Sequence, residues 1–308
     1  MGKGYRVYRE GYPHHTFTRG IDGNVIFYST ADCLYFTTLY CCLARRYGIV
    51  PMAFSIMPNH VHSNERAPGK RQFLLFHSRL NSEFSHGYNE AHGRAGALLD
   101  PEFGYAAKTV GKRIRDNLCY IANNATVGKL CDDILKYRWN LLAYRESDHP
   151  FSEKIVLRRS SKALQRAVRL VRYFRDGDVP MTYVRQEVVM KGLNAVERQQ
   201  LTDFIIVQYN CLDYRAMESF YQGSFTQACL SFRANSGSEY DIPEDYEDYS
   251  IYREMNRLAR NRGVDLEHGA FETMAPDVIA SLVRLYQMKG FPVRQIRRFL
   301  HLKDSTQQ

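Results

Sequence analysis

Apolar and less apolar residues alternate along residues 49–56 of the chain. The apolar positions are Val50, Met52, Phe54 and Ile56. A period of two over this length predicts a β-strand with one buried face. Pro58-Asn59 then predicts a tight turn. Residues 60–65 are therefore expected to return as an antiparallel strand.

Helical periodicity flanks this predicted hairpin, over residues 32–47 before it and 72–92 after it. An earlier strand is expected over residues 14–18, which gives a βαββα order. A further helix is predicted over residues 109–124 and would carry Tyr120 near its C-terminal end. The apolar positions that indicate this helix are Val110, Ile114, Leu118, Ile121 and Ala125.

The second half of the chain shows helical periodicity alone, over residues 152–175, 195–209, 214–232, 276–288 and 293–300. Residues 236–248 are polar and acidic and contain Pro243, which predicts a linker. We therefore expect an α+β fold in four parts. These are a catalytic domain over residues 1–150, a helical region over 151–235, the linker, and a helical region over 249–308.

Two of the predicted helices carry basic faces. The helix over residues 152–175 has a stripe that would track phosphates, although an ordinary solvated face has the same pattern; this stripe comprises Arg158, Lys162, Arg166, Arg169 and Tyr173. The last two helices resemble a helix-turn-helix. In that interpretation Arg294, Arg297 and Arg298 are exposed to DNA while Val293, Ile296 and Leu300 face inward. A packed helical hairpin fits the same pattern.

The composition narrows the class of protein. The 308 residues are 44% hydrophobic, which supports buried cores, and the net charge of +9 favours an anionic partner such as a phosphate backbone. No apolar run approaches the length that a membrane span needs, so we expect a cytoplasmic protein without membrane contact. The seven cysteines form no C-x-x-C pair, which favours buried thiols over disulfides or a zinc knuckle.

Two motifs are candidates for chemistry. His60 and His62 are two apart in a predicted strand, so both imidazoles would project from one face and form half of a metal site. Arg113, Asn117, Tyr120 and Asn124 fall on one face of the predicted helix. If this helix packs on the strand, the Asn124 side-chain oxygen would be a third ligand beside the Tyr120 hydroxyl. A surface histidine pair and a partly buried tyrosine are the plainer alternatives.

Such a site would suit transesterification at phosphorus, with the phenolic oxygen of Tyr120 as nucleophile. The ordinary pKa of tyrosine is about 10, so positive charge from a metal, Lys112 or Arg113 would help to ionise it.

The segment Ala53-Phe-Ser-Ile-Met-Pro-Asn-His-Val-His62 resembles the signature of single-tyrosine HUH transposases of the insertion-sequence type, and most of all that of the repeat-associated tyrosine transposases. Four other segments resemble family segments in the same order, over about residues 12–145. They are His15-Thr-Phe-Thr-Arg-Gly20, Tyr88-Asn-Glu-Ala-His-Gly-Arg-Ala-Gly96, Cys119-Tyr-Ile-Ala-Asn-Asn124 and Tyr137-Arg-Trp-Asn140. After His62 the chain continues with Ser63-Asn-Glu-Arg66 where the family is apolar, which predicts an early end to the strand.

The resemblance implies a ferredoxin-like catalytic domain, an antiparallel sheet with helices on its faces, followed by an all-α C-terminal region. It also implies a DNA transposase that cleaves and rejoins single-stranded or hairpin DNA through a 5′-phosphotyrosine at Tyr120. The metal would be Mg or Mn, held by His60, His62 and Asn124; imidazole ligands favour Mn on general grounds. Candidate DNA contacts are Arg19, Lys112, Arg113, Arg294, Arg297 and Arg298.

Several alternatives stay open. The second hypothesis, after the transposase, is a domesticated, catalytically weak DNA-binding protein of the same fold. A monomer and a homodimer both stay open. A replication initiator or relaxase often has a second tyrosine on the nucleophile helix, whereas Tyr120 is the one tyrosine within residues 109–124.

Overall fold

The computed structural model of the chain describes residues 6–235, 247–264, 266 and 274–302. At its centre is a five-stranded sheet in the order β1-β5-β2-β4-β3. The strands are β1 (Arg6–Val7), β2 (His14–Arg19), β3 (Val50–Met57), β4 (His60–Arg66) and β5 (Gly104–Ala107). Strands β5, β2, β4 and β3 pair antiparallel, and β1 adds to the edge parallel to β5. The fold is α+β as predicted, but the sheet is mixed and not purely antiparallel.

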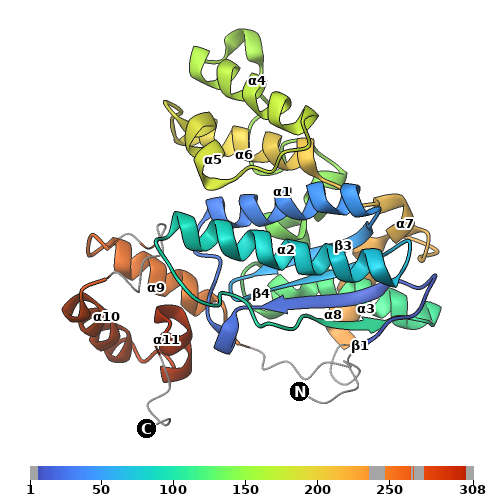
Figure 1. Cartoon of the computed structure of the whole chain (residues 1–308), viewed down its shortest axis with the longest axis horizontal. Coiled ribbons are helices and arrows are strands. Elements are labelled where there is room, and N and C mark those ends of the chain that lie inside the picture. Colours follow the sequence, from blue (N-terminus) through green and yellow to red (C-terminus); the bar gives the residue numbers. More distant parts are fainter. Residues whose placement is uncertain (1–5, 236–246, 265, 267–273, 303–308) are drawn as a thin grey trace.

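Helices cover both faces of this sheet (Figure 1). On one face lie α1 (Thr30–Tyr47) and α2 (Lys70–Ala91), and on the other α3 (Gly111–Val127) and α8 (Phe225–Asn235). Strand β3 is consequently buried on both sides: Phe54 packs against α1, and Ala53 lies in the core that α3 and α8 share. The prediction of one buried face was wrong for this strand. Its small, less apolar residues are buried because a second helical layer lies over them.

Strand β4 does not end early. It continues through Ser63, Asn64 and Glu65 to Arg66, because each of these buried polar side chains has a partner. Ser63 Oγ lies 2.5 Å from Thr16 Oγ1. Asn64 donates to Asn117 Oδ1 at 2.7 Å, and Glu65 accepts from Tyr40 at 2.6 Å. Satisfied polar groups replace the apolar contacts that the sequence pattern lacks.

A helical layer lies over α1, on its side away from the sheet (Figure 1). It consists of α4 (Lys162–Asp176), α5 (Tyr183–Met190) and α6 (Ala195–Tyr209), whose apolar faces join the α1 core. The exposed side of α4 carries Lys162, Arg166, Arg169 and Tyr173 of the predicted basic stripe. The helix begins ten residues later than predicted, so Arg158 lies on the 3₁₀ turn Leu157–Arg159 instead. The single helix predicted over residues 214–232 was wrong. The structure has α7 (Tyr214–Glu218) and then α8, separated by turns that include Gly223.

Three helices pack against the end of the sheet where β3 turns into β4: α9 (Ser250–Arg260), α10 (Pro276–Met288) and α11 (Val293–Leu300) (Figure 1). The last two match the predicted ranges. The contacts of α11 use its backbone: Val25 N donates to Arg298 O, and the Tyr28 hydroxyl donates to Phe299 O at 2.6 Å. Among the described residues after β5 there are helices, turns and loops, and no strand.

Short 3₁₀ turns connect these elements at Ile21–Gly23, Ile134–Lys136, Arg138–Asn140, Leu142–Arg145 and Leu157–Arg159. The predicted linker lies outside the described residues except for Glu247 and Asp248. None of the described helices is both long and apolar enough to cross a membrane. The proposed division of the chain into domains stays a prediction.

Candidate active site

The two histidines of β4 and the tyrosine of α3 meet on one face of the sheet. His60 and His62 project toward α3, with ring centroids 4.7 Å apart. The His62 and Tyr120 rings are 5.6 Å apart and meet edge to face. Tyr120 lies in the middle of α3 rather than near its end, because the helix continues to Val127. Helix α3 thus crosses β4 at the level of these residues, so that the side chains of His60, His62 and Tyr120 lie together.

A third histidine, His15 on β2, belongs to the same cluster. Its Nε2 lies 2.9 Å from His62 Nδ1, and its ring is 5.6 Å from that of Tyr120. His15 is 2% exposed and His62 is 1% exposed. The sequence analysis treats His15 only as part of a strand. The β2–β4 pairing, which sets Phe17 opposite His62, would have shown that residue 15 is on the His62 face.

The turn before β4 fixes the orientation of the His60 ring. Asn59 Nδ2 donates to Gly23 O at 3.0 Å, so its Oδ1 faces His60 Nδ1 at 2.7 Å. An amide oxygen accepts only, so Nδ1 of His60 carries the proton and Nε2 carries the lone pair. A partner of this kind on the far nitrogen is typical of metal-binding histidines.

The polar face of α3 runs as predicted, from the exposed Arg113 through the buried Asn117 and Tyr120 to Asn124. Asn117 accepts from Asn64 of β4, which ties the helix to the strand. Asn124 follows Tyr120 by one turn, and its buried Nδ2 makes no hydrogen bond within the part of the chain that is described. Its amide therefore fits a contact from outside the protein. In the structure, Asn124 lies one helical turn beyond Tyr120 and does not contact the histidines.

A residue of the C-terminal region covers the cluster. The Tyr249 ring is 5.9 Å from that of His60, and Tyr249 N donates to Gly128 O at 3.0 Å at the end of α3. This approach requires a glycine, because a Cβ on Gly128 would lie 2.5 Å from Tyr249 Cδ2. Tyr120 is 5% exposed and His60 7% exposed under this cover. Tyr120 itself lies in the core that α3 shares with α8, beside Met217, Phe225 and Cys229.

The predicted basic contacts are not all at this site. Arg19 is half-buried and lies opposite His60 in the register of β2 and β4. Lys112 and Arg113 are exposed on the first turn of α3. On α11, Arg298 turns inward, pairs with Glu247 and is 16% exposed. Arg294 is more open and lies 3.7 Å from the same carboxylate; Arg297 is half-buried.

The interpretation of α11 as a groove-reading helix needs correction. Its exposed and buried faces differ from the prediction, since Val293 is 59% exposed while the Arg298 side chain is largely covered and lies against Gly23. The reason is that the chain segment before α1 packs against the side of α11 that was predicted to face DNA. Ile296 and Leu300 are buried as predicted.

A metal would find few protein ligands here. No group of three His, Cys, Asp or Glu residues among those described is arranged to hold a metal ion. His15 Nε2 and His62 Nδ1 lie within hydrogen-bonding distance of each other, and a donor set of His60, His62 and the amide of Asn124 stays a prediction. Such a set leaves most of the coordination shell to water or substrate oxygens, as Mn or Mg tolerates.

Comparisons with known proteins give one distant likeness. No family model matches the chain, and no curated protein matches it. Among solved structures, the chain is similar to a REP-associated tyrosine transposase bound to a REP hairpin. The two are 16% identical, the similarity covers 47% of this chain and 84% of that chain, and the TM-score is 0.41.

Proposed function

We propose that this protein is a metal-dependent, single-strand DNA transesterase that works as a transposase. Tyr120 is the nucleophile, and His60, His62 and Asn124 hold the metal. The observation that carries the proposal is the buried cluster in which His15 of β2 and His62 of β4 meet Tyr120 of α3, with His60 beside His62. The resemblance of residues 53–62 to the HUH signature supports the same assignment.

Each residue of the cluster has a role in this proposal. Tyr120 supplies the attacking oxygen. Asn59 orients the His60 ring through Nδ1, and His15 orients the His62 ring through Nδ1. Arg19, opposite His60, and Lys112 and Arg113, at the start of α3, would attract the phosphates of the strand.

The reaction is a balanced exchange of two esters. The Tyr120 oxygen forms a bond to phosphorus, and the bond from phosphorus to the 3′ oxygen of the DNA breaks, with its electron pair leaving on that oxygen. The phenol loses one proton and the departing 3′ hydroxyl gains one. The product is a 5′-phosphotyrosine, which a 3′ hydroxyl of another strand can attack in the reverse sense. A bound divalent ion would polarise a nonbridging phosphate oxygen.

A ferredoxin-like architecture for the catalytic part belongs to this proposal. The order β2-α1-β3-β4-α2-β5 with neighbours β5-β2-β4-β3 is the antiparallel βαββαβ arrangement of such a domain. The helices after β5 would then be an added C-terminal region. Its α9–α11 part supplies Tyr249, the residue over His60.

The test is a search for the covalent adduct. A pool of hairpin oligonucleotides with randomised single-stranded flanks, labelled at the 3′ end, is incubated with protein and Mn²⁺ or Mg²⁺. We expect labelled protein after denaturing electrophoresis, lost with a chelator and in Tyr120→Phe. Tyr173→Phe, which changes an exposed tyrosine on α4, is the matched control and should retain the adduct. The same adduct yield in Tyr120→Phe would refute the assignment.

A second candidate is a catalytically weak DNA-binding protein of the same fold. The observation in its favour is the burial of the cluster, since Tyr120 is 5% exposed and Tyr249 lies over His60. This candidate predicts that hairpins bind without any adduct at every metal concentration. The same oligonucleotide pool therefore separates the two functions.

A further inference from the structure

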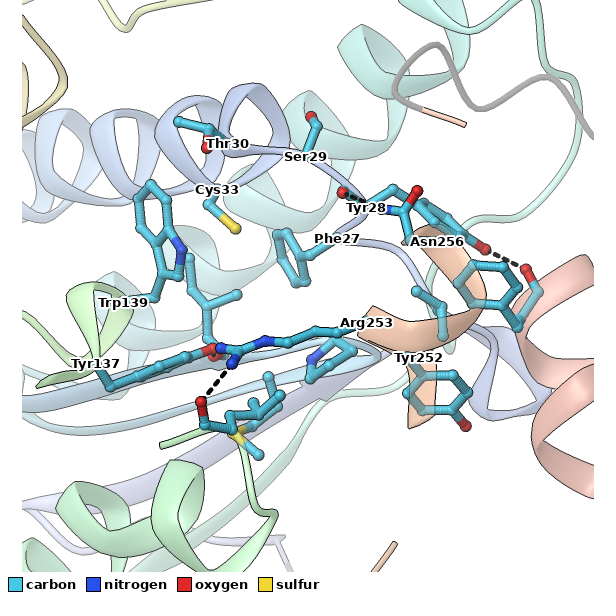
Figure 2. Close-up of a pocket in the computed structure, with 16 residues that line it drawn as sticks. Phe27, Tyr28, Ser29, Thr30, Cys33, Tyr137, Trp139, Tyr252, Arg253 and Asn256 are labelled. Carbon is cyan, nitrogen blue, oxygen red and sulfur yellow. Dashed lines mark hydrogen bonds between the residues drawn. The ribbon is translucent and has the colours of Figure 1, made fainter. Parts of the chain in front are cut away.

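A second feature lies at the β3–β4 turn. It is a cavity of about 220 Å³ between α9, the segment before α1, and the turn that carries Trp139. Phe27, Tyr137 and Trp139 provide aromatic walls, and Arg253 and Asn256 of α9 close it (Figure 2). Met57 and Pro58 also line it, two residues before His60 along the chain. The cavity and the candidate active site thus share one turn.

The size and walls of this cavity limit what it holds. An engineered cavity of about 150 Å³ takes up benzene, so 220 Å³ has room for one heterocyclic ring system. Sites for drug-sized ligands begin at about 300 Å³. Aromatic side chains with a planar guanidinium are the usual surroundings of an unstacked nucleobase. Figure 2 shows Trp139 and Asn256 on opposite sides of the cavity, with the Arg253 side chain extending between them.

The polar atoms of the cavity add hydrogen-bonding capacity. Asn256 Nδ2 donates to Tyr28 O at 3.1 Å, which directs Oδ1 as an acceptor. That Oδ1 is buried and makes no hydrogen bond to any residue that the structure describes. A buried acceptor left in this state costs free energy, so a ligand with an N–H edge would stabilise it. All four bases present such an edge, whereas an apolar side chain of another protein does not.

The geometry points to a pocket for one extrahelical nucleobase, which Trp139 and Arg253 sandwich and Asn256 binds at its edge. The base would belong to the single strand that continues from the phosphodiester at Tyr120. This inference rests on the proposed function, since it assigns to that function a place where its substrate is held. A free nucleotide has the same ring chemistry, and the experiment separates the two sources.

The chain has one tryptophan, so its fluorescence reports on this pocket alone. Three ligands are titrated while strand binding is followed by anisotropy: a mixed-sequence single-stranded oligonucleotide, an abasic strand of equal length, and the four nucleoside monophosphates. We expect the oligonucleotide to quench Trp139 and the abasic strand to bind without quenching. Quenching by monophosphates at comparable concentration would instead assign the pocket to a free nucleotide and overturn its role in holding the strand.

Variants test the residues. Arg253→Ala should weaken quenching by roughly tenfold or more in concentration, the effect of losing one stacking partner. Thr30→Phe, at an exposed position on the cavity rim, should prevent quenching without altering the core. Arg257→Ala, on the exposed side of α9, is the control and should quench as the parent does. Unchanged Trp139 emission with bound oligonucleotide would refute the pocket.

The adduct assay keeps this inference distinct from the proposed function. Tyr120→Phe should lose the adduct but retain Trp139 quenching. An adduct formed without any quenching would refute the pocket and leave Tyr120 as the nucleophile. Quenching by the strand without any adduct would retain the pocket and refute the transesterase.

Discussion

The most quantitative prediction concerns His14, a buried histidine on the α2 face of β2. Its ring stacks on that of Tyr8, with centroids 4.5 Å apart, and its Nε2 accepts from Arg9 N at 3.0 Å. Burial lowers the pKa of His14 from 6.5 to about 4; the charge of Glu65 opposes this shift and that of His77 adds to it. The folded protein thus keeps His14 neutral at pH values where the unfolded chain protonates it.

The sign and size of the effect follow. The unfolded state binds more protons between pH 6.5 and about 4, so the free energy of unfolding is highest above pH 6.5 and falls as the pH decreases through this window. A difference of about 2.5 pH units at about 1.4 kcal/mol each corresponds to about 3.5 kcal/mol. This is a substantial fraction of the stability of an ordinary domain, about 5–15 kcal/mol.

Urea denaturation at half-unit steps from pH 7.5 to 4 measures this loss. His14→Phe retains the stacking and removes this titration, so its free energy of unfolding should fall by about 3 kcal/mol less than that of the parent over the same range. His86→Phe, at an exposed position on α2, is the matched control and should retain the parental slope. Equal slopes in the parent and in His14→Phe would refute the reasoning.

Three further predictions concern the site and its surroundings. Asn59→Ala frees the His60 ring and should raise the Mn²⁺ concentration for half-maximal adduct formation by about 10–100-fold; an unchanged metal requirement would contradict this. Gly128→Ala places a Cβ 2.5 Å from the Tyr249 ring, so the ring must shift, and adduct formation should become faster; a rate equal to or below the parental rate argues against Tyr249 as a cover. Glu65→Leu leaves the partners of a buried carboxylate unsatisfied and should lower the free energy of unfolding by about 3–5 kcal/mol in urea, whereas a loss below about 1 kcal/mol would show that the network is dispensable.

The sequence predicted the helices and turns whose positions depend on residue spacing within a single element. The ranges of α6, α10 and α11 agree with their apolar periodicity, and Pro58-Asn59 marks the turn that sets His60 and His62 on one face. These features depend on spacing within one element. The meeting of β4 with α3 was a conditional expectation, and the structure brings His62 and Tyr120 together.

Features that depend on pairing between distant elements were not predictable in the same way. His15 joins the cluster because β2 pairs with β4, and a strand partner cannot be identified from the alternation of one strand. Arg298 faces inward because Glu247 and Gly23 lie beside it, although its spacing suits an exposed residue. The helix predicted over residues 214–232 is broken, since apolar spacing persists across turns that end α7 and precede α8.

The way in which α11 is attached has a consequence for how the protein can change over evolutionary time. The helix is held by Val25 N bonded to Arg298 O and by the Tyr28 hydroxyl bonded to Phe299 O, both of which use carbonyl groups that every residue has. Substitutions at exposed positions such as Val293 and Arg294 leave those bonds in place. Mutation can therefore vary the outer face of α11 without loosening the helix from the segment that leads into α1.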